Sequence, residues 1–520
     1  MNQLIYFWIC TTIYALILVL ISFKLSKYGS DNYGYNFYIQ AIRYNNHRFI
    51  KSFDKFLNYS EPTDPQFFFW LLSYFSEKTI KIITVILNSL LFIAMGLVFY
   101  FFVKQTRLSG YVYLIYPAFL FTPIYFFGSN SRLYGLSARG IGLLLFFLLT
   151  LSVYFLESNF SYTWLLAGIF CGFLIWGSNL FAQQAFIGFS FFLLLQGYYW
   201  MAILLFLSVI VFIILCRGYA FRFFKNRANY FIIYKNILAT KFILYYRKSI
   251  WLDFVSEFWN FKKKSFFSHL FYVYSNPVIQ MIVFVPLVII ICAGLLTDHL
   301  DLDTVFMFMH VNYRFQFSIL VAGISCFVFT SFRPTRFLGE PERYIEIANP
   351  FITILGCFFI LEYFGKTFLI IYSIFATCFS LFLILIYILG LNSKKDTLKS
   401  DTNIVAKHIK EHAGNREVRF FSNNQEWMKF YLPEPFKMVY YYPTVDKLAN
   451  IPLNLIMIKF PFVEESYIMQ VLRYYKINYF LIDKNNCSLR EFANMEELYE
   501  DEVSKLVFVR NEEDQLIDAI

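Results

Sequence analysis

Residues 80–103 read IKIITVILNSLLFIAMGLVFYFFV and decide which class of protein this chain belongs to. Lys81 is the one charged residue in the stretch, and about 20 apolar residues suffice to cross the hydrocarbon core of a bilayer as a helix. Comparable runs recur as far as residue 390. We therefore expect about eleven membrane-spanning helices, near residues 4–23, 80–103, 109–127, 140–156, 162–178, 180–197, 199–216, 277–296, 314–331, 346–364 and 367–390.

The amino-acid composition indicates the same class. Hydrophobic residues make up 58% of the 520 positions and charged residues only 15%, whereas soluble proteins carry about 25% charged residues. This balance excludes a soluble globular protein, and it excludes a disordered chain, which needs low hydrophobicity. Gly, Pro and Cys are too sparse for a collagen-like or disulfide-built chain. The sequence thus predicts an α-helical polytopic membrane protein.

The pattern changes beyond residue 392, where short β-rich runs alternate with helical ones. This alternation predicts a small soluble α/β domain over residues 393–520 with a mostly parallel sheet. The domain has no glycine-rich phosphate-binding motif, so we expect a docking or substrate-gating module. The predicted helices are 401–413, 464–475 and 488–499, and the predicted strands are 418–422, 438–442, 455–460, 479–483 and 506–510.

Three connections in the membrane part are too long or too charged for simple turns. Loop 24–79 contains acidic residues and two aromatic segments, 33–44 and 67–75, which we interpret as helices lying at the membrane interface. Loop 217–276 is strongly basic. Loop 332–345 is short and dense in both Arg and Glu. We expect the polar chemistry of the protein to lie in these loops.

The net charge of +10 resides in the membrane part, because residues 393–520 hold more Asp and Glu than Lys and Arg. With a cytoplasmic N-terminus, eleven alternating spans place the three loops and the C-terminal domain on the outer face. The basic loop 217–276 then violates the tendency of Lys and Arg to stay inside. We favour this placement, with the basic loop meeting lipid phosphate. The alternative is one miscounted span, which puts everything from residue 217 onward on the opposite side from loop 24–79.

Four segments resemble the GT-C superfamily of membrane glycosyltransferases, which use polyprenyl-phosphate sugars. They are 31–43 (DNYGYNFYIQAIR), 64–73 (DPQFFFWLLS), 339–350 (GEPERYIEIANP) and 478–485 (NYFLIDKN). The first opens the loop after the first helix with an acid, and the second is a proline-plus-aromatic run. The third is a charged Arg-Tyr motif before a late helix, and the fourth is similar to a strand of a small C-terminal domain. The resemblance implies a GT-C-like membrane domain over residues 1–392.

Acidic residues of the first loop are the candidates for chemistry. Asp31 can accept the proton of an acceptor hydroxyl or bind a divalent cation, and the alternative is that it caps the following helix. Asp64 is a candidate for the substrate site, and the alternative is a turn or cap beside Pro62 and Pro65. The resemblance implies that Asp31 is the catalytic residue. It leaves the need for a divalent cation open, and no other cofactor is expected.

Arginines are the candidates for holding the phosphate of a lipid-linked donor, because a guanidinium binds phosphate bidentately. We assign this role to Arg343, Arg132 and Arg139, with Tyr344 beside the same headgroup. Arg132 and Arg139 could instead meet ordinary lipid headgroups, and Tyr344 could belong to an interfacial tyrosine belt. The alternative for Arg343 is an ion pair with one of three nearby glutamates, Glu340, Glu342 or Glu346.

The expected protein is a multi-pass glycosyltransferase of the bacterial inner membrane. As the resemblance implies, it transfers a sugar from a polyprenyl-phosphate donor to an envelope glycan or lipid acceptor on the extracytoplasmic face, with inversion. Its partners are membrane lipid, that donor and that acceptor, and no nucleic acid. The alternatives are a lipid-glycan flippase or transporter and an O-antigen-type polymerase. Transporters keep charges inside their helices, whereas the charges here concentrate in loops, which favours interfacial chemistry.

Overall fold

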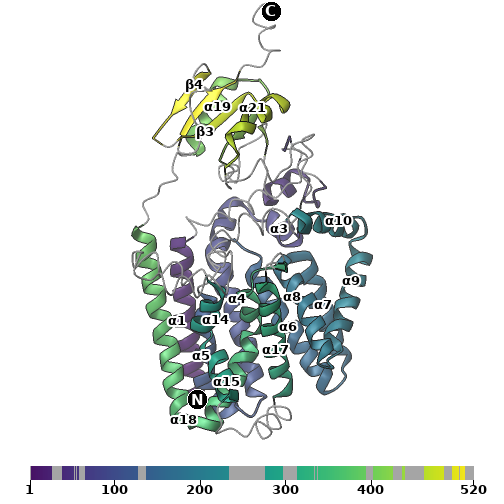
Figure 1. The fold of residues 1–520 in the computed structure, drawn as a ribbon, viewed down its shortest axis with the longest axis vertical. Helices are drawn as coiled ribbons and strands as arrows, with labels where there is room; N and C mark the ends of the chain where they lie inside the picture. The colour runs from purple at the N-terminus through teal and green to yellow at the C-terminus, as the bar shows by residue number, and fades with distance from the viewer. Residues whose placement is uncertain are drawn as a thin grey trace, which may run out of the picture.

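The computed structural model of the chain shows a bundle of long helices with a small sheet domain at one end (Figure 1). The ranges that it describes are 2–25, 38–51, 53, 56–57, 62, 65–126, 136–233, 276–296, 313–332, 334–335, 338–393, 402–424, 436–439, 462–484, 495–502 and 504–509. All statements below concern these residues.

Helices account for nearly all of the described membrane part. The long or apolar ones are α1 (Asn2–Leu25), α4 (Glu77–Lys104), α5 (Val112–Leu120), α6 (Arg139–Ser158), α7 (Tyr162–Ser178), α8 (Leu180–Leu195), α9 (Trp200–Leu215), α14 (Pro277–Phe284), α15 (Pro286–Leu296), α17 (Arg314–Ser331) and α18 (Glu342–Ser393). The shorter or more polar ones are α3 (Phe67–Ser73), η1 (Ser109–Tyr111), η2 (Pro123–Tyr125) and α10 (Arg217–Ile233).

Five of the described helices are long and apolar enough to cross a membrane: α1, α4, α6, α17 and α18. Each of the eleven stretches expected to span the membrane lies largely in helix, although the number of crossings stays a prediction. The segments expected at the interface are also helical, over residues 38–44 and in α3. The protein is thus an α-helical membrane protein with a C-terminal sheet domain.

Helix α18 consists of two arms that meet at Gly365. Its backbone there has φ 80° and ψ 177°, a conformation that only glycine adopts without strain. The break separates the two helices expected over 346–364 and 367–390. The first arm begins at Glu342, so the prediction of loop structure for the whole of 332–345 was wrong at its end. An acidic residue in the first turn stabilises a helix by opposing its dipole, and charge density alone does not indicate a loop.

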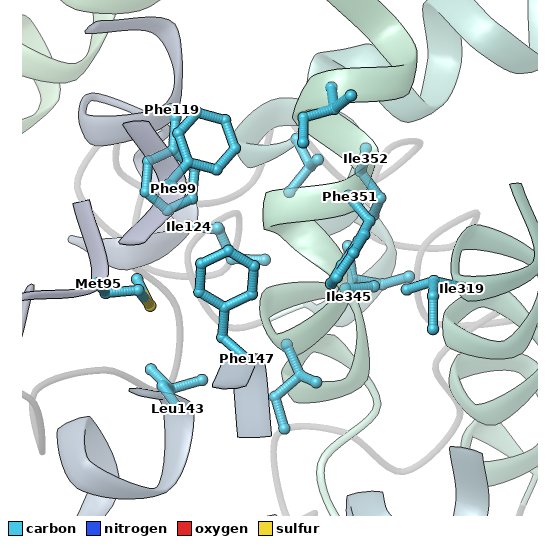
Figure 2. Packing of buried hydrophobic residues seen from close by; sticks show 14 of the residues in the cluster. Met95, Phe99, Phe119, Ile124, Leu143, Phe147, Ile319, Ile345, Phe351 and Ile352 are labelled. Carbon is cyan, nitrogen blue, oxygen red and sulfur yellow. The ribbon is translucent and has the colours of Figure 1, made fainter. Parts of the chain in front are cut away.

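The bundle core is built from aromatic and branched side chains of several helices. Phe99 of α4 stacks on Phe119 of α5 with ring centroids 3.9 Å apart. Glycines allow close approach where helices cross, since a Cβ atom at Gly172 of α7 would lie 2.7 Å from Cβ of Ser208 in α9. Figure 2 shows part of this core, with Met95, Phe99, Phe119, Ile124, Leu143, Phe147, Ile319, Ile345, Phe351 and Ile352 labelled.

The C-terminal domain contains a five-stranded sheet of order β2-β1-β3-β5-β4. Pairing is parallel between β2, β1 and β3 and antiparallel between β3, β5 and β4. The expectation of a mostly parallel sheet was therefore wrong for half of its ladders. The elements are α19 (Thr402–Ala413), β1 (Arg419–Ser422), β2 (Lys437–Met438), α21 (Glu465–Tyr474), β3 (Tyr479–Asp483), β4 (Glu496–Glu500) and β5 (Ser504–Phe508).

Most predicted elements of this domain are confirmed, and one is wrong. The helices expected at 401–413 and 464–475 and the strands at 418–422, 479–483 and 506–510 are present within a few residues. Two residues of the strand expected at 438–442 lie in or beside β2, and 455–460 lies outside the described residues. The helix expected at 488–499 is instead strand β4 over its described end. Pairing with β5, including an ion pair between Glu497 and Lys505 at 2.6 Å, outweighs the local helix propensity of Glu and Leu.

The first loop and the C-terminal sheet are joined directly. The backbone N–H of Leu57 donates to the carbonyl of Met438 at 2.8 Å, and Phe56 forms a parallel bridge with the same residue. Side chains of both regions share one hydrophobic cluster, in which Phe53 and Phe56 lie with Phe420 and other residues of the sheet. The first loop therefore extends the edge of the sheet, and both lie at the same end of the bundle.

Candidate functional site

The site is built where helices α6 and α18 begin. Arg139 is the first residue of α6, and its backbone N–H donates to Oγ of Ser137 at 3.1 Å. Its guanidinium forms an ion pair with the carboxylate of Glu346, one turn into α18. The two side chains are only 5% and 1% exposed. A buried pair of this kind at the end of membrane helices is a candidate site by default, because charges are costly there.

The ion pair leaves part of each partner unsatisfied. Arg139 uses Nη2 for Glu346, while its Nε and Nη1 are buried and have no hydrogen-bond acceptor among the described residues. The Oε1 atom of Glu346 likewise has no donor in the described part of the chain. Buried donors without acceptors cost about 1–3 kcal/mol each, more when charged. These two donors of the guanidinium are therefore suited to anionic acceptors.

Arg343 lies one turn before Glu346 on α18 and takes a different partner. Its Nη2 pairs with Glu340, and the side chains of the two are 11% and 12% exposed. Its guanidinium carbon lies 5.2 Å from the ring centroid of Phe181 in α8, in cation–π contact. The charges of Arg343 and Arg139 both act on Glu346. The two arginines thus belong to one buried electrostatic cluster.

Tyr344 fixes the turn that leads into α18. Its hydroxyl donates to the carbonyl of Leu338 at 2.9 Å, and its ring packs edge-on against Phe181 with centroids 5.3 Å apart. Gly339 has φ 136°, and a Cβ atom there would lie 3.3 Å from the Tyr344 hydroxyl. A glycine is needed at this position for its backbone and for space. The observed contacts give Tyr344 a structural role, and a contact with a headgroup stays a prediction.

A stripe of polar side chains continues from the cluster into the bundle. Glu342, Glu346, Asn349 and Thr353 recur at helical spacing on one face of α18, and all four are buried. Sequence reasoning missed Asn349 and Thr353 as part of the site. The signal that could have found them is the 3–4-residue spacing of polar positions within an otherwise apolar helix.

Three of the six predicted site residues lie in this cluster, namely Arg139, Arg343 and Tyr344. The other three, Asp31, Arg132 and Asp64, lie outside the described residues. Their roles and their distance from Arg343 stay predictions. In the ranges that the structure describes, no three His, Cys, Asp or Glu side chains are grouped so as to hold a metal ion.

The cluster lies directly beneath the first loop and the C-terminal sheet. Leu136 and Ala138, just before Arg139, pack in the same hydrophobic cluster as the first loop and residues of the sheet. Described residues of the loop are held together, because the Gln66 side chain makes two hydrogen bonds with the backbone of Ile50, at 2.8 and 3.0 Å. Tyr38 stacks on Phe69 of α3 with ring centroids 4.9 Å apart. The loop, the sheet and the charged cluster therefore form one continuous end of the protein.

Comparisons with known proteins give similarity to solved structures. No protein-family model and no curated protein match the chain. Among solved structures, the chain is similar to the archaeal oligosaccharyltransferase AglB from Archaeoglobus fulgidus, solved in complex with an inhibitory peptide and a dolichol-phosphate. The TM-score is 0.46 at 12% identity, covering 91% of this chain and 69% of AglB. A similarity of this level does not by itself assign a function.

Proposed function

We propose that this protein is a membrane glycosyltransferase that moves a sugar from a polyprenyl-phosphate donor to an envelope glycan or lipid acceptor. In this proposal the reaction takes place on the extracytoplasmic face of a bacterial inner membrane, where the C-terminal domain also lies. The four segments that resemble GT-C enzymes support it, and so does the grouping of Arg139, at the start of α6, with Arg343 and Tyr344, at the start of α18.

The observation that carries the proposal is the guanidinium of Arg139. It lies at a membrane-helix terminus, it is almost fully buried, and its Nε and Nη1 have no acceptor within the described ranges. Nε and Nη1 point to different sides of the guanidinium, and an anionic phosphate oxygen can accept from either donor. Glu346 holds the guanidinium through Nη2 and fixes its orientation. A lipid phosphate at the membrane end of α6 is the ligand that this arrangement suits.

The proposed chemistry is a direct displacement at the anomeric carbon of the sugar. The acceptor oxygen forms a bond to this carbon while the bond from carbon to the phosphate oxygen breaks. Asp31 takes the proton of the acceptor hydroxyl, directly or with a divalent cation, and the departing lipid phosphate keeps the electron pair. Arg139 and Arg343 stabilise the negative charge that develops on this phosphate.

A substitution of Arg139 by Lys tests the assignment. Lysine keeps the positive charge beside Glu346 but cannot place donors at the positions of both Nε and Nη1. Since hydrogen bonds to charged groups contribute about 1.5–3 kcal/mol, we expect sugar transfer to fall by about 10- to 150-fold. The assay uses membranes with equal amounts of each variant and a panel of undecaprenyl-phosphate sugars labelled in the sugar. Arg227→Lys is the matched control, because Arg227 is also buried but lies in α10.

Undecaprenyl phosphate without sugar provides a second readout. It should raise the midpoint of thermal unfolding of the purified wild type, and it should raise that of Arg139→Lys less. Transfer by Arg139→Lys at the wild-type rate would remove Arg139 from the site. A wild type that neither transfers any sugar of the panel nor responds to undecaprenyl phosphate would contradict the proposed function itself.

A transporter or flippase remains the second candidate, and one observation favours it. Because α18 begins at Glu342, the charge of Glu346 lies inside a membrane helix and is followed by Asn349 and Thr353 on the same buried face. Polar stripes at membrane depth mark transport paths in many proteins. Asn349→Leu distinguishes the two functions in reconstituted vesicles. If the protein transports a lipid-glycan through the bundle, this variant should lose translocation. The glycosyltransferase proposal instead requires that the wild type transfers sugar and shows no translocation.

A further inference from the structure

Helix α10 has a basic face that no other described element covers. In Figure 1, α10 lies crosswise at the end of α9 and does not continue in the direction of α9. On a helical projection, Arg217, Phe221, Arg222 and Lys225 fall on one continuous side, and all four are exposed. Phe221 is 67% exposed. The helix contains no acidic residue.

The opposite side of α10 is firmly attached to the protein. Ala220 and Phe223 are buried in a cluster with Trp176 of α7 and Phe212 of α9. Asn226 donates through Nδ2 to the carbonyl of Pro62 at 3.3 Å. A second link to the first loop is the hydroxyl of Tyr219, which accepts from the backbone N–H of Gln66 at 3.1 Å. The exposed face therefore has a fixed orientation.

We propose that the face formed by Arg217, Phe221, Arg222 and Lys225 binds the headgroups of anionic phospholipids. Three cations without a neighbouring acid on the helix complement lipid phosphates, and an exposed phenylalanine among them matches the apolar layer just below the headgroups. Helix α10 follows the apolar helix α9, and if α9 crosses the membrane as expected from its sequence, this face lies at the level of the headgroups. This inference does not depend on the proposed function, because it concerns a surface outside the charged cluster.

Photo-crosslinking at Phe221 tests the proposal with the full-length protein. Phe221 is replaced by p-benzoylphenylalanine, and the purified protein is reconstituted in vesicles of equal parts phosphatidylglycerol and phosphatidylcholine. After irradiation, mass spectrometry gives the ratio of the two lipid adducts. One cation near an anionic surface corresponds to about a fivefold preference, so we expect phosphatidylglycerol adducts to exceed phosphatidylcholine adducts by at least that factor. The preference should shrink in 1 M salt, where charges are screened within about 3 Å.

Two controls make the result specific. The triple variant Arg217→Gln/Arg222→Gln/Lys225→Gln should bring the adduct ratio close to one. The charge-matched triple variant Lys407→Gln/Lys410→Gln/Arg416→Gln removes three exposed cations from the C-terminal domain and should leave the ratio unchanged.

A probe at Phe206, which is 66% exposed on α9, should form lipid adducts without preference for either headgroup. Three results would overturn the proposal: equal adducts at Phe221, adducts with protein only, or no adduct at Phe221 when Phe206 reacts. Elution of each variant as the same monodisperse peak in size-exclusion chromatography confirms that the comparison is made on folded protein.

Discussion

Arg139 and Glu346 form an ion pair whose side chains are 5% and 1% exposed, whereas Lys437 and Glu417 of the C-terminal domain form one whose side chains are 46% and 43% exposed. Water solvates each partner of the exposed pair in the absence of the other, so the pair contributes little to stability. In the buried pair each charge depends chiefly on its partner, because burial removes the hydration of both. Either partner of the exposed pair can thus be removed at little cost in stability, whereas each partner of the buried pair needs the other.

The largest expected effect comes from removing one partner of the buried pair. Glu346→Leu leaves the Arg139 charge buried without compensation, and we expect the free energy of unfolding to fall by about 3–5 kcal/mol. Unfolding of the purified protein by titration with SDS measures this loss. The double variant Arg139→Met/Glu346→Leu should recover most of the stability, because an apolar pair replaces the ionic one. Equal stability of the single and double variants would mean that water or lipid reaches the pair.

A smaller loss of stability is expected when a substitution adds volume to the bundle core instead of removing a charge. A Cβ atom at Gly142 of α6 would lie 2.7 Å from Cγ of Asn179, whose side chain caps α8 by accepting from the N–H of Ala182 at 2.8 Å. We expect Gly142→Ala to cost about 1–3 kcal/mol through overpacking. Gly110→Ala is the control, because a Cβ atom at Gly110 meets nothing within 4 Å. The same SDS titration compares the two, and equal losses would show that the bundle relaxes around the extra methyl group.

Loss of the hydrogen bond that joins the first loop to the C-terminal sheet should lower stability by a smaller amount. Leu57→Pro removes the N–H that donates to Met438, and relative to Leu57→Ala it should cost about 0.5–1.5 kcal/mol, the net contribution of one hydrogen bond. We expect faster proteolytic release of the C-terminal domain from the proline variant than from the alanine variant. Equal rates of release would indicate that the shared hydrophobic cluster alone holds the domain in place.

The exposed pair should show the smallest effect, and it should depend on pH. The pKa of Glu417 is lowered, chiefly by the hydrogen bond from Lys437 and also by the charge of Arg419. An unfolded glutamate titrates at about 4.3, so the contribution is complete above that pH and is lost as the pH falls towards the lower folded pKa. The loss should not exceed about 1 kcal/mol. Hydrogen exchange of the β1 and β2 amides between pH 3 and 7 measures it, and Glu417→Gln should abolish this part of the pH dependence.

The sequence predicted those features that short stretches determine on their own. Apolar runs gave the helices, because a membrane requires a continuous apolar segment of defined length. The predicted strand 479–483 coincides with β3, whose five residues are all buried. Strand β4 was predicted as a helix because its identity depends on pairing with β5, and Glu and Leu favour a helix when considered alone.

The ion-pair partners within the site could not be predicted, because they include residues far apart in the sequence. The sequence allowed Arg343 to pair with any of three glutamates in its own segment, and the structure selects Glu340. Glu346 is instead taken by Arg139, which is 207 positions away in the chain. Helical spacing reveals which residues of one helix are neighbours, but it carries no information about which other helix supplies a counter-charge. Arg343 and Tyr344 could therefore be proposed from a resemblance and Arg139 from the absence of acids in its loop, but the contacts among these residues could not be predicted.

The bond between Leu57 and Met438 also imposes an order of events during synthesis. At about 5–20 residues per second, roughly 20–80 seconds separate the emergence of these two residues from the ribosome. Throughout that interval the apolar side chains of Phe53 and Phe56 have no sheet to cover them. The nascent protein thus displays a hydrophobic loop that chaperones and proteases can recognise, and the sheet domain, which is made later, conceals it. A chain that stops before β2 would keep this signal exposed, so cells could distinguish truncated copies from finished ones by the first loop alone.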